Sequence, residues 1–148
     1  MTKSNGFTLV ELIMVVAIVA ILATMATISY SSYINKARMQ NEVSAILDIE
    51  RTIKIYQVLT DKLPPNLAAA GLDNIKDKWG NPYVYQPIAT SDPGHVRRDR
   101  FNNPVNTDYD LYSKGPDGRT QMEFDAKFAK DDIVRANNGD YVGLASEY

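Results

Sequence analysis

The sequence predicts an α+β fold, in which one long N-terminal helix packs on a small antiparallel β-sheet with an irregular C-terminal loop region. Three observations indicate this. An apolar run covers residues 7–28 and continues, without glycine or proline, into an amphipathic segment. Leu63-Pro64-Pro65 then ends the helix, because proline disfavours helical backbone in the residue before it. After that point, short alternating segments are separated by glycine, proline and asparagine, as strands and turns are. The 148 residues suffice for one such domain, not for two.

The apolar run makes residues 7–29 the expected transmembrane first half of the helix, since about 20 apolar residues cross a bilayer. Three interpretations of it compete. A cleaved signal peptide would need a small-residue site after the run, and no Ala-x-Ala pattern follows residues 20–30. An uncleaved signal anchor would keep Lys3 on the cytoplasmic side. The third interpretation places a processing site before the run, between Gly6 and Phe7.

Glu11 distinguishes these interpretations, because a carboxylate in a membrane helix costs about 2.5–3.5 kcal/mol at its centre and less near an end. Cleavage after Gly6 would create a cationic amine on Phe7. A carboxylate and an ammonium about 4 Å apart gain roughly 4 kcal/mol at an effective dielectric of 20. The partner amine could belong to the same chain or to a neighbouring copy. The simpler alternative is that Glu11 reaches out to the membrane interface.

Residues 30–62 form the expected amphipathic half of the same helix. Apolar Ile46, Ile49, Ile53 and Tyr56 recur every three or four residues, which indicates one buried face. We expect this face to pack on the sheet rather than to bind a ligand.

The remaining residues, 63–148, are expected to form a globular head. Strand signals lie at residues 83–85, after a Gly-Asn-Pro turn, at residues 108–118, where a strand runs into a tight turn, and at residues 140–144. The chain has no cysteine, so disulfides cannot stabilise a head outside the cytoplasm. Packing, oligomerisation or a metal must do so.

Enzymatic and nucleic-acid functions are not favoured. The chain contains no nucleophile–His–acid set with a believable context, no glycine-rich phosphate loop and no zinc-ligand spacing. Its net charge of −2 makes nucleic-acid binding unlikely. His95 lies beside Arg97, Arg98 and Arg100, and this basic loop could touch phosphate or DNA, but a solvated loop is the favoured interpretation.

The stretch "GFTLVELI" at residues 6–13 resembles the start of the type IV pilin superfamily, which includes the pseudopilins of type II secretion. The resemblance implies that a prepilin peptidase removes residues 1–6 by cutting between Gly6 and Phe7, and that Phe7 is N-methylated. It also implies a helical filament in which Glu11 of one subunit meets the Phe7 amine of another. One departure is that residues 24–28 lack the proline common late in this helix, which leaves open whether the helix melts on assembly.

The head resembles the major pseudopilin, the G-type subunit, in "DKWGNPYVY", "DLYSKGPDG" and "DDI". The resemblance implies a calcium site in the C-terminal loop. Its ligands would be Asp117, Asp131 and Asp132, with backbone carbonyls near Leu111 and Ser113. The segment between Gly118 and Asp131 is longer than the family's pattern, so Asp125 is an alternative ligand. The competing interpretation is that Asp117 shapes a turn and that Asp131 and Asp132 are solvated.

The expected function is therefore that of a non-enzymatic subunit that polymerises into a periplasmic pseudopilus for protein export. It would start as a single-pass inner-membrane protein with its C-terminal domain in the periplasm. The expected partners are further copies of the chain, minor pseudopilins or pilins, an inner-membrane assembly platform and a prepilin peptidase. One alternative is a type IV pilin, forming a surface fibre for adhesion, twitching or DNA uptake. Another, of a different class, is a signal-anchored periplasmic binding domain or enzyme.

Overall fold

The computed structural model describes residues 6–148, without the side chains of residues 25–29, 31 and 32. The chain divides into two compact units, Met1–Ala37 and Arg38–Tyr148, and each is described by itself. The expected leader, residues 1–6, lies outside the described residues except for Gly6.

Helix α1, Leu9–Thr60, is the long helix that the sequence predicts, and its 52 residues run from the first unit into the second. It ends where the sequence indicates. Asp61 has a left-handed backbone with φ of 57°, and its N–H donates to the Gln57 carbonyl at 2.8 Å. This arrangement satisfies one of the last carbonyls of the helix before the prolines.

In the first unit, every side chain of α1 from Leu9 to Thr24 is exposed, so apolar residues face solvent all around this part of the helix. Ile13 and Ile21 are 60% and 59% exposed, for example. Over the described part of the chain, no helix combines the length and the apolarity that crossing a membrane would require. This finding differs from the transmembrane first half expected at residues 7–29, of which residues 25–29 lie outside the described side chains.

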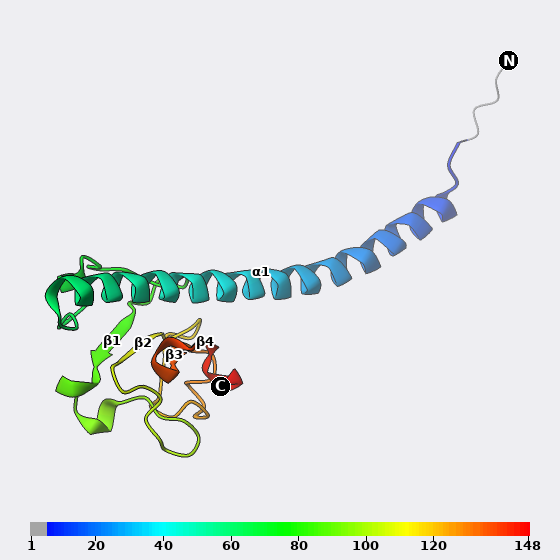
Figure 1. The fold of residues 1–148 in the computed structure, drawn as a ribbon. Helices are drawn as coiled ribbons and strands as arrows, with labels where there is room; N and C mark the ends of the chain where they lie inside the picture. The colour runs from blue at the N-terminus through cyan, green and yellow to red at the C-terminus, as the bar shows by residue number, and fades with distance from the viewer. Residues whose placement is uncertain (1–5) are drawn as a thin grey trace. The chain divides into compact units, whose positions relative to one another are not determined.

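The second unit contains a four-stranded antiparallel sheet with the strand order β1-β2-β3-β4 (Figure 1). The strands are β1 Val84–Pro87, β2 Tyr109–Ser113, β3 Ile133–Ala136 and β4 Tyr141–Leu144. The register pairs Val84 with Tyr112, and Ile133 with both Ser113 and Leu144. The predicted α+β fold, with a long helix and a small antiparallel sheet, is confirmed.

Short 3-10 helices connect these elements. They are Ala68–Ala70, Ile88–Thr90, Pro93–His95, Asn137–Gly139 and Ala145–Glu147. Two long segments that are mostly irregular join the strands. Residues 91–108 lie between β1 and β2, and residues 114–132 lie between β2 and β3. The second segment belongs to the irregular C-terminal loop region that the sequence predicts. They are tied together where Arg98 bridges to Glu123 and to Pro104.

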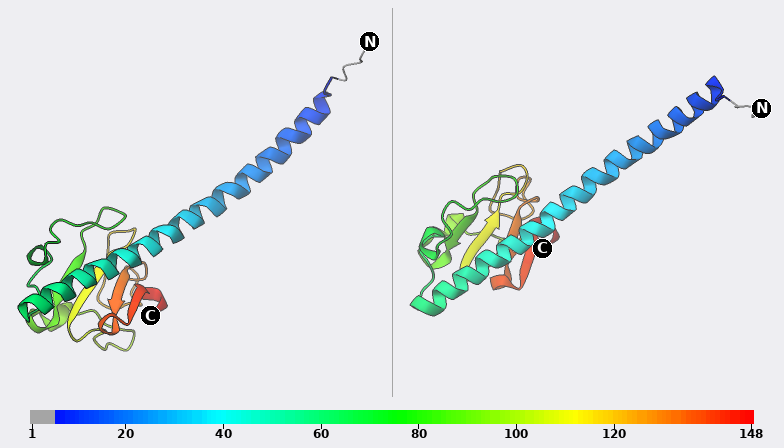
Figure 2. Two further views of the ribbon diagram at one scale, coloured as in Figure 1. Left: turned by 45° about the horizontal axis from the view of Figure 1, so that its top comes forward. Right: turned by 90° about the horizontal axis from the view of Figure 1, so that it is seen from above.

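The head has two hydrophobic clusters, one on each face of the sheet. On one face the stripe of Ile46, Ile49 and Ile53 packs on Tyr109 and Leu111, as the spacing along the helix predicts. Figure 2 shows the second-unit part of α1 lying along this face. On the other face a second cluster forms, whose members are Val105, Tyr112, Phe124, Val134, Ala136 and Ala145. Every residue of β2 and β3 is consequently buried.

Candidate functional site

The first turn of α1 holds the expected assembly residues. The Thr8 N–H and hydroxyl both donate to Oε2 of Glu11 at 2.9 Å, and the Glu11 N–H donates to the Thr8 hydroxyl oxygen at 3.2 Å. These bonds form a capping box, which satisfies two of the orphan donors at the helix start. Glu11 therefore has a role within its own chain. The sequence analysis missed this role, although Thr8-x-x-Glu11 before an apolar run is its signal.

Gly6 and Phe7 precede α1 as irregular, exposed backbone. Phe7 is 85% exposed, and no atom lies within 4 Å of the position that a Cβ on Gly6 would occupy. A protease could therefore reach the peptide bond between them without unfolding the helix. Within the described residues, the bonds to Thr8 use only Oε2 of Glu11, so they leave Oε1 for a second donor. Processing at this bond and pairing of Glu11 with an amine stay predictions.

The carboxylates expected to bind calcium are in different environments. Asp117 is exposed, and its Oδ1 accepts the Arg119 N–H at 2.7 Å in a local turn. Asp131 is half-buried, whereas Asp132 is fully buried. In the part of the chain that the structure describes, no three acidic, histidine or cysteine side chains come together as a possible metal group. Calcium binding at these residues stays a prediction.

The backbone positions expected to complete that site lie in β2. Leu111 is paired with Tyr85, and Ser113 with Ile133, at the strand's regular register. The Ser113 hydroxyl donates to Oδ2 of Asp77 at 2.6 Å. These residues thus take part in the sheet and in its connection to the Gly-Asn-Pro turn.

Asp132 pairs with Arg97, a residue that the sequence analysis placed in a solvated loop. Nη2 of Arg97 donates to Oδ2 of Asp132 at 2.7 Å, and the two side chains are 3% and 0% exposed. The same oxygen accepts the Thr120 hydroxyl at 2.6 Å. Burial raises the pKa of Asp132 to about 6, against the opposing effect of Arg97, so the carboxylate is charged at neutral pH. The expectation that Arg97 is solvated is wrong, and the competing interpretation of Asp132 as a solvated carboxylate is wrong as well.

A second buried cation, Arg135 of β3, joins the sheet to α1. Its Nε donates to Oε1 of Glu50 at 3.1 Å, and its two terminal nitrogens donate to Asp108 at 2.9 and 2.7 Å. The guanidinium lies 4.0 Å from the ring centre of Tyr109. Gly139 passes so close to Glu50 that a Cβ there would clash with Oε1. This network fixes how the helix sits on the sheet.

The "DKWGNPY" motif organises the other end of the same helix–sheet contact. Asp77 accepts the N–H groups of Trp79 and Asn81 at 3.0 and 2.8 Å, which shapes the turn. The buried Glu42 of α1 accepts the Lys78 N–H at 3.1 Å and the Tyr83 hydroxyl. Burial raises the pKa of Tyr83 most, and the hydrogen bond to Glu42 raises it further. The motif therefore determines the fold of the head.

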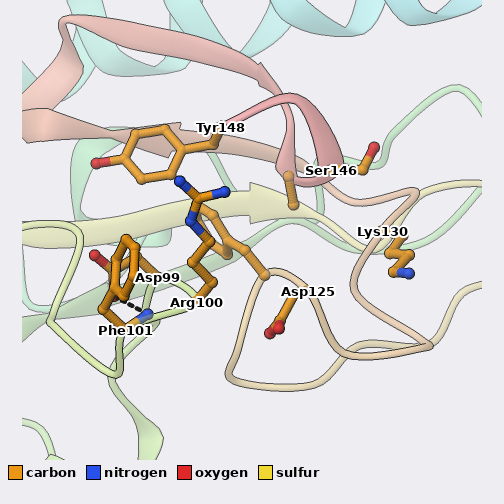
Figure 3. A pocket seen from close by; sticks show the side chains of 9 residues that line it. Asp99, Arg100, Phe101, Asp125, Lys130, Ser146 and Tyr148 are labelled. Atoms are coloured by element: carbon orange, nitrogen blue, oxygen red, sulfur yellow. Dashed lines mark hydrogen bonds between the residues drawn. The ribbon is translucent and has the colours of Figure 1, made fainter.

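A cavity of about 340 Å³ opens beside the C-terminus. Its lining, drawn in Figure 3, comprises Asp99, Arg100, Phe101, Phe124, Asp125, Lys130, Ala145, Ser146 and Tyr148. Two acids and two bases line it, so their charges balance. Asp99 is already used, because its Oδ1 accepts the N–H groups of Phe101 and Asn103, both at 2.8 Å.

Comparison with known families decides the assignment. The model for the prokaryotic N-terminal methylation motif matches residues 1–27, and the model for type II secretion system protein G matches residues 29–131. The chain belongs to the type II secretion system protein G family. It is a pseudopilin subunit of type II secretion. The two family matches support this assignment more specifically than the alternative assignment as a surface type IV pilin. No curated protein and no solved structure matches the chain.

The pseudopilin family is a structural one, and its members assemble with other pseudopilins into a filament. The family match ends at Asp131. Asp132, β3 and β4 lie beyond it, so the pairing of Asp132 with Arg97 comes from the structure of this chain alone.

Proposed function

We propose that this protein is the major pseudopilin, which polymerises into a periplasmic pseudopilus that drives protein export, and that it is not an enzyme. The observation that carries the proposal is the first unit of α1. From Leu9 to Thr24 its side chains are all exposed, and Leu12, Ile13 and Val16 are each at least 60% exposed. Burying one such side chain stabilises an assembly by about 1.5–3 kcal/mol. Neighbouring helices in a filament core would supply that burial.

Before assembly the subunit would be a single-pass inner-membrane protein with its C-terminal domain in the periplasm. A prepilin peptidase would cut between Gly6 and Phe7 and methylate the new amine. An assembly platform in the inner membrane would then add the subunit to the filament, beside minor pseudopilins. The exposed peptide bond before α1 supports this order of events, because the protease needs an extended, accessible substrate.

In the filament, Glu11 would pair with the Phe7 amine of a neighbouring subunit. The capping box supports this role, because it fixes the carboxylate at the first turn of α1 and uses only one of its oxygens. An incoming subunit would then meet a carboxylate of defined position rather than a mobile side chain.

Two substitutions separate pairing from capping. Glu11→Gln removes the charge and keeps a side chain that serves in a capping box. Thr8→Ala removes the cap and keeps the charge. Filaments are measured by sedimentation and electron microscopy in cells that lack the native copy, with membrane levels of each variant checked by immunoblot.

If Glu11 pairs with a neighbouring amine, Glu11→Gln abolishes filaments at normal membrane levels, while Thr8→Ala still forms them. The opposite pattern, with filaments from Glu11→Gln and none from Thr8→Ala, would show that the carboxylate acts only as a helix cap.

A further inference from the structure

The loop between β2 and β3 contains a buried carboxylate that needs a cation. Asp132 is 0% exposed and directly precedes β3. A buried charge is retained in proteins only when it is paired or coordinates a metal. This loop resembles a calcium-binding loop. The central question for the head is therefore whether a side-chain cation or a calcium ion neutralises Asp132.

The residues present do not fit a calcium ion. Calcium takes six to eight oxygen ligands. Oδ2 of Asp132 is already occupied by Arg97 and Thr120. The Asp117 carboxylate is exposed and used in its own turn. The described acidic side chains do not assemble into a group of three or more around Asp132.

Arg97, in contrast, is surrounded by groups that suit a fixed cation. Besides its bond to Asp132, Nη1 donates to the Gln121 carbonyl at 2.6 Å and to the Thr120 hydroxyl. The guanidinium lies 4.4 Å from the ring centre of Tyr112 and 5.1 Å from that of Phe124. Aromatic faces attract a cation, and more strongly when it is desolvated.

The bond between Arg97 and Asp132 is a single one in this structure. Nη2 donates to Oδ2, whereas Nε of Arg97 and Oδ1 of Asp132 are both buried without a hydrogen-bond partner among the described residues. The ion pair is therefore charge-assisted without being bidentate.

We propose that Arg97 is the cation that neutralises Asp132 in this loop, so that the head folds without calcium. The arginine brings together four parts of the chain. Its backbone N–H donates to Asp110 of β2 at 2.7 Å, while its side chain contacts residues 120–121, the start of β3 and the ring of Phe124. A single residue, through its backbone and its side chain, thus performs the cross-linking that several ligands around a metal would provide.

The test uses the full-length protein in detergent. Trp79 is its only tryptophan and packs against the core of the head, so its fluorescence reports unfolding of the head in the intact chain. The melting temperature is measured with added calcium chloride and with a chelator. We expect the two wild-type curves to coincide. A melting temperature that calcium raises and the chelator lowers would overturn the proposal.

Substitution supplies the second arm. Arg97→Met removes the cation and leaves Asp132 buried and unpaired, so we expect the melting temperature to fall by about 10–20 °C. The control is Arg100→Met, which removes an exposed arginine from the same loop and should shift the melting temperature by only about 1–2 °C. Equal effects of the two substitutions would also overturn the proposal.

A third variant covers the case in which Arg97→Met does not fold. Arg97→Met combined with Asp132→Asn leaves no unpaired buried charge, and such a charge is the main cost of breaking a buried pair. We expect the double variant to fold and to recover most of the lost melting temperature. A double variant no more stable than Arg97→Met would show that Arg97 does not act by neutralising Asp132.

Discussion

The two units of this pseudopilin differ in how they treat the apolar side chains of α1, the helix that runs through both. In the first unit, α1 exposes apolar side chains in every direction. In the second, the same helix buries Ile46, Ile49 and Ile53 completely or nearly so against the sheet. The charges differ in the same way, because Glu11 is exposed whereas Glu42 and Glu50 are buried. The comparison teaches that the head buries its apolar stripe and pairs its buried charges within the chain, whereas the described apolar residues of the first unit stay exposed, as the proposed filament requires.

The largest effect should come from the buried cation that joins helix and sheet. Arg135→Met leaves Glu50 short of a partner beneath α1, and breaking a buried pair costs about 3–5 kcal/mol in the free energy of unfolding. Lys54 also pairs with Glu50, at 3.0 Å, but its side chain is 62% exposed. Lys54→Met should therefore cost at most about 1 kcal/mol.

Both variants are compared by chemical unfolding of the full-length protein, followed by Trp79 fluorescence. Similar losses for Arg135→Met and Lys54→Met would mean that the buried network contributes no more than a surface pair. The claim that charges within the head are satisfied internally would then be wrong.

A somewhat smaller effect is expected from matched isoleucines in the two units. Ile53 is 0% exposed, so Ile53→Ala should lower the free energy of unfolding of the head by about 2–5 kcal/mol. Ile13 is 60% exposed, and Ile13→Ala should leave that free energy unchanged. In a filament assay the order should reverse, with Ile13→Ala reducing assembly at an unchanged melting temperature of the head. An Ile13→Ala variant that assembles like the wild type would remove the distinction between the two units.

The local spacing of apolar residues is enough to predict the long helix, its buried apolar stripe and three of the strands. Ile46, Ile49 and Ile53 recur with the period of a helix. The alternation of side chains at residues 83–85 indicates a strand, and the structure confirms strand pairing there from Val84 onward. Strand β3 was missed for a physical reason. Both of its faces are buried, so it lacks alternation, and Arg135 in its middle suggests a polar segment.

The site was harder to predict than the fold, because its partners are distant in sequence. Arg97 and Asp132 are separated by 35 positions, and nothing local distinguishes Arg97 from its exposed neighbour Arg100. The capping box was predictable, since Thr8 and Glu11 stand three residues apart at the helix start. Gly6, Phe7 and Glu11 were singled out by the apolar run and the acid within it, and the resemblance then implied their roles. Their processing and pairing depend on a state of the chain that follows proteolysis.

The intact mass of the protein isolated from its native membranes tests the central claim most directly, because Glu11 gains a counter-ion between subunits only if the amine of Phe7 exists. We predict the mass of residues 7–148 with one added methyl group. A mass that includes Met1, or any part of residues 1–6, would contradict the account.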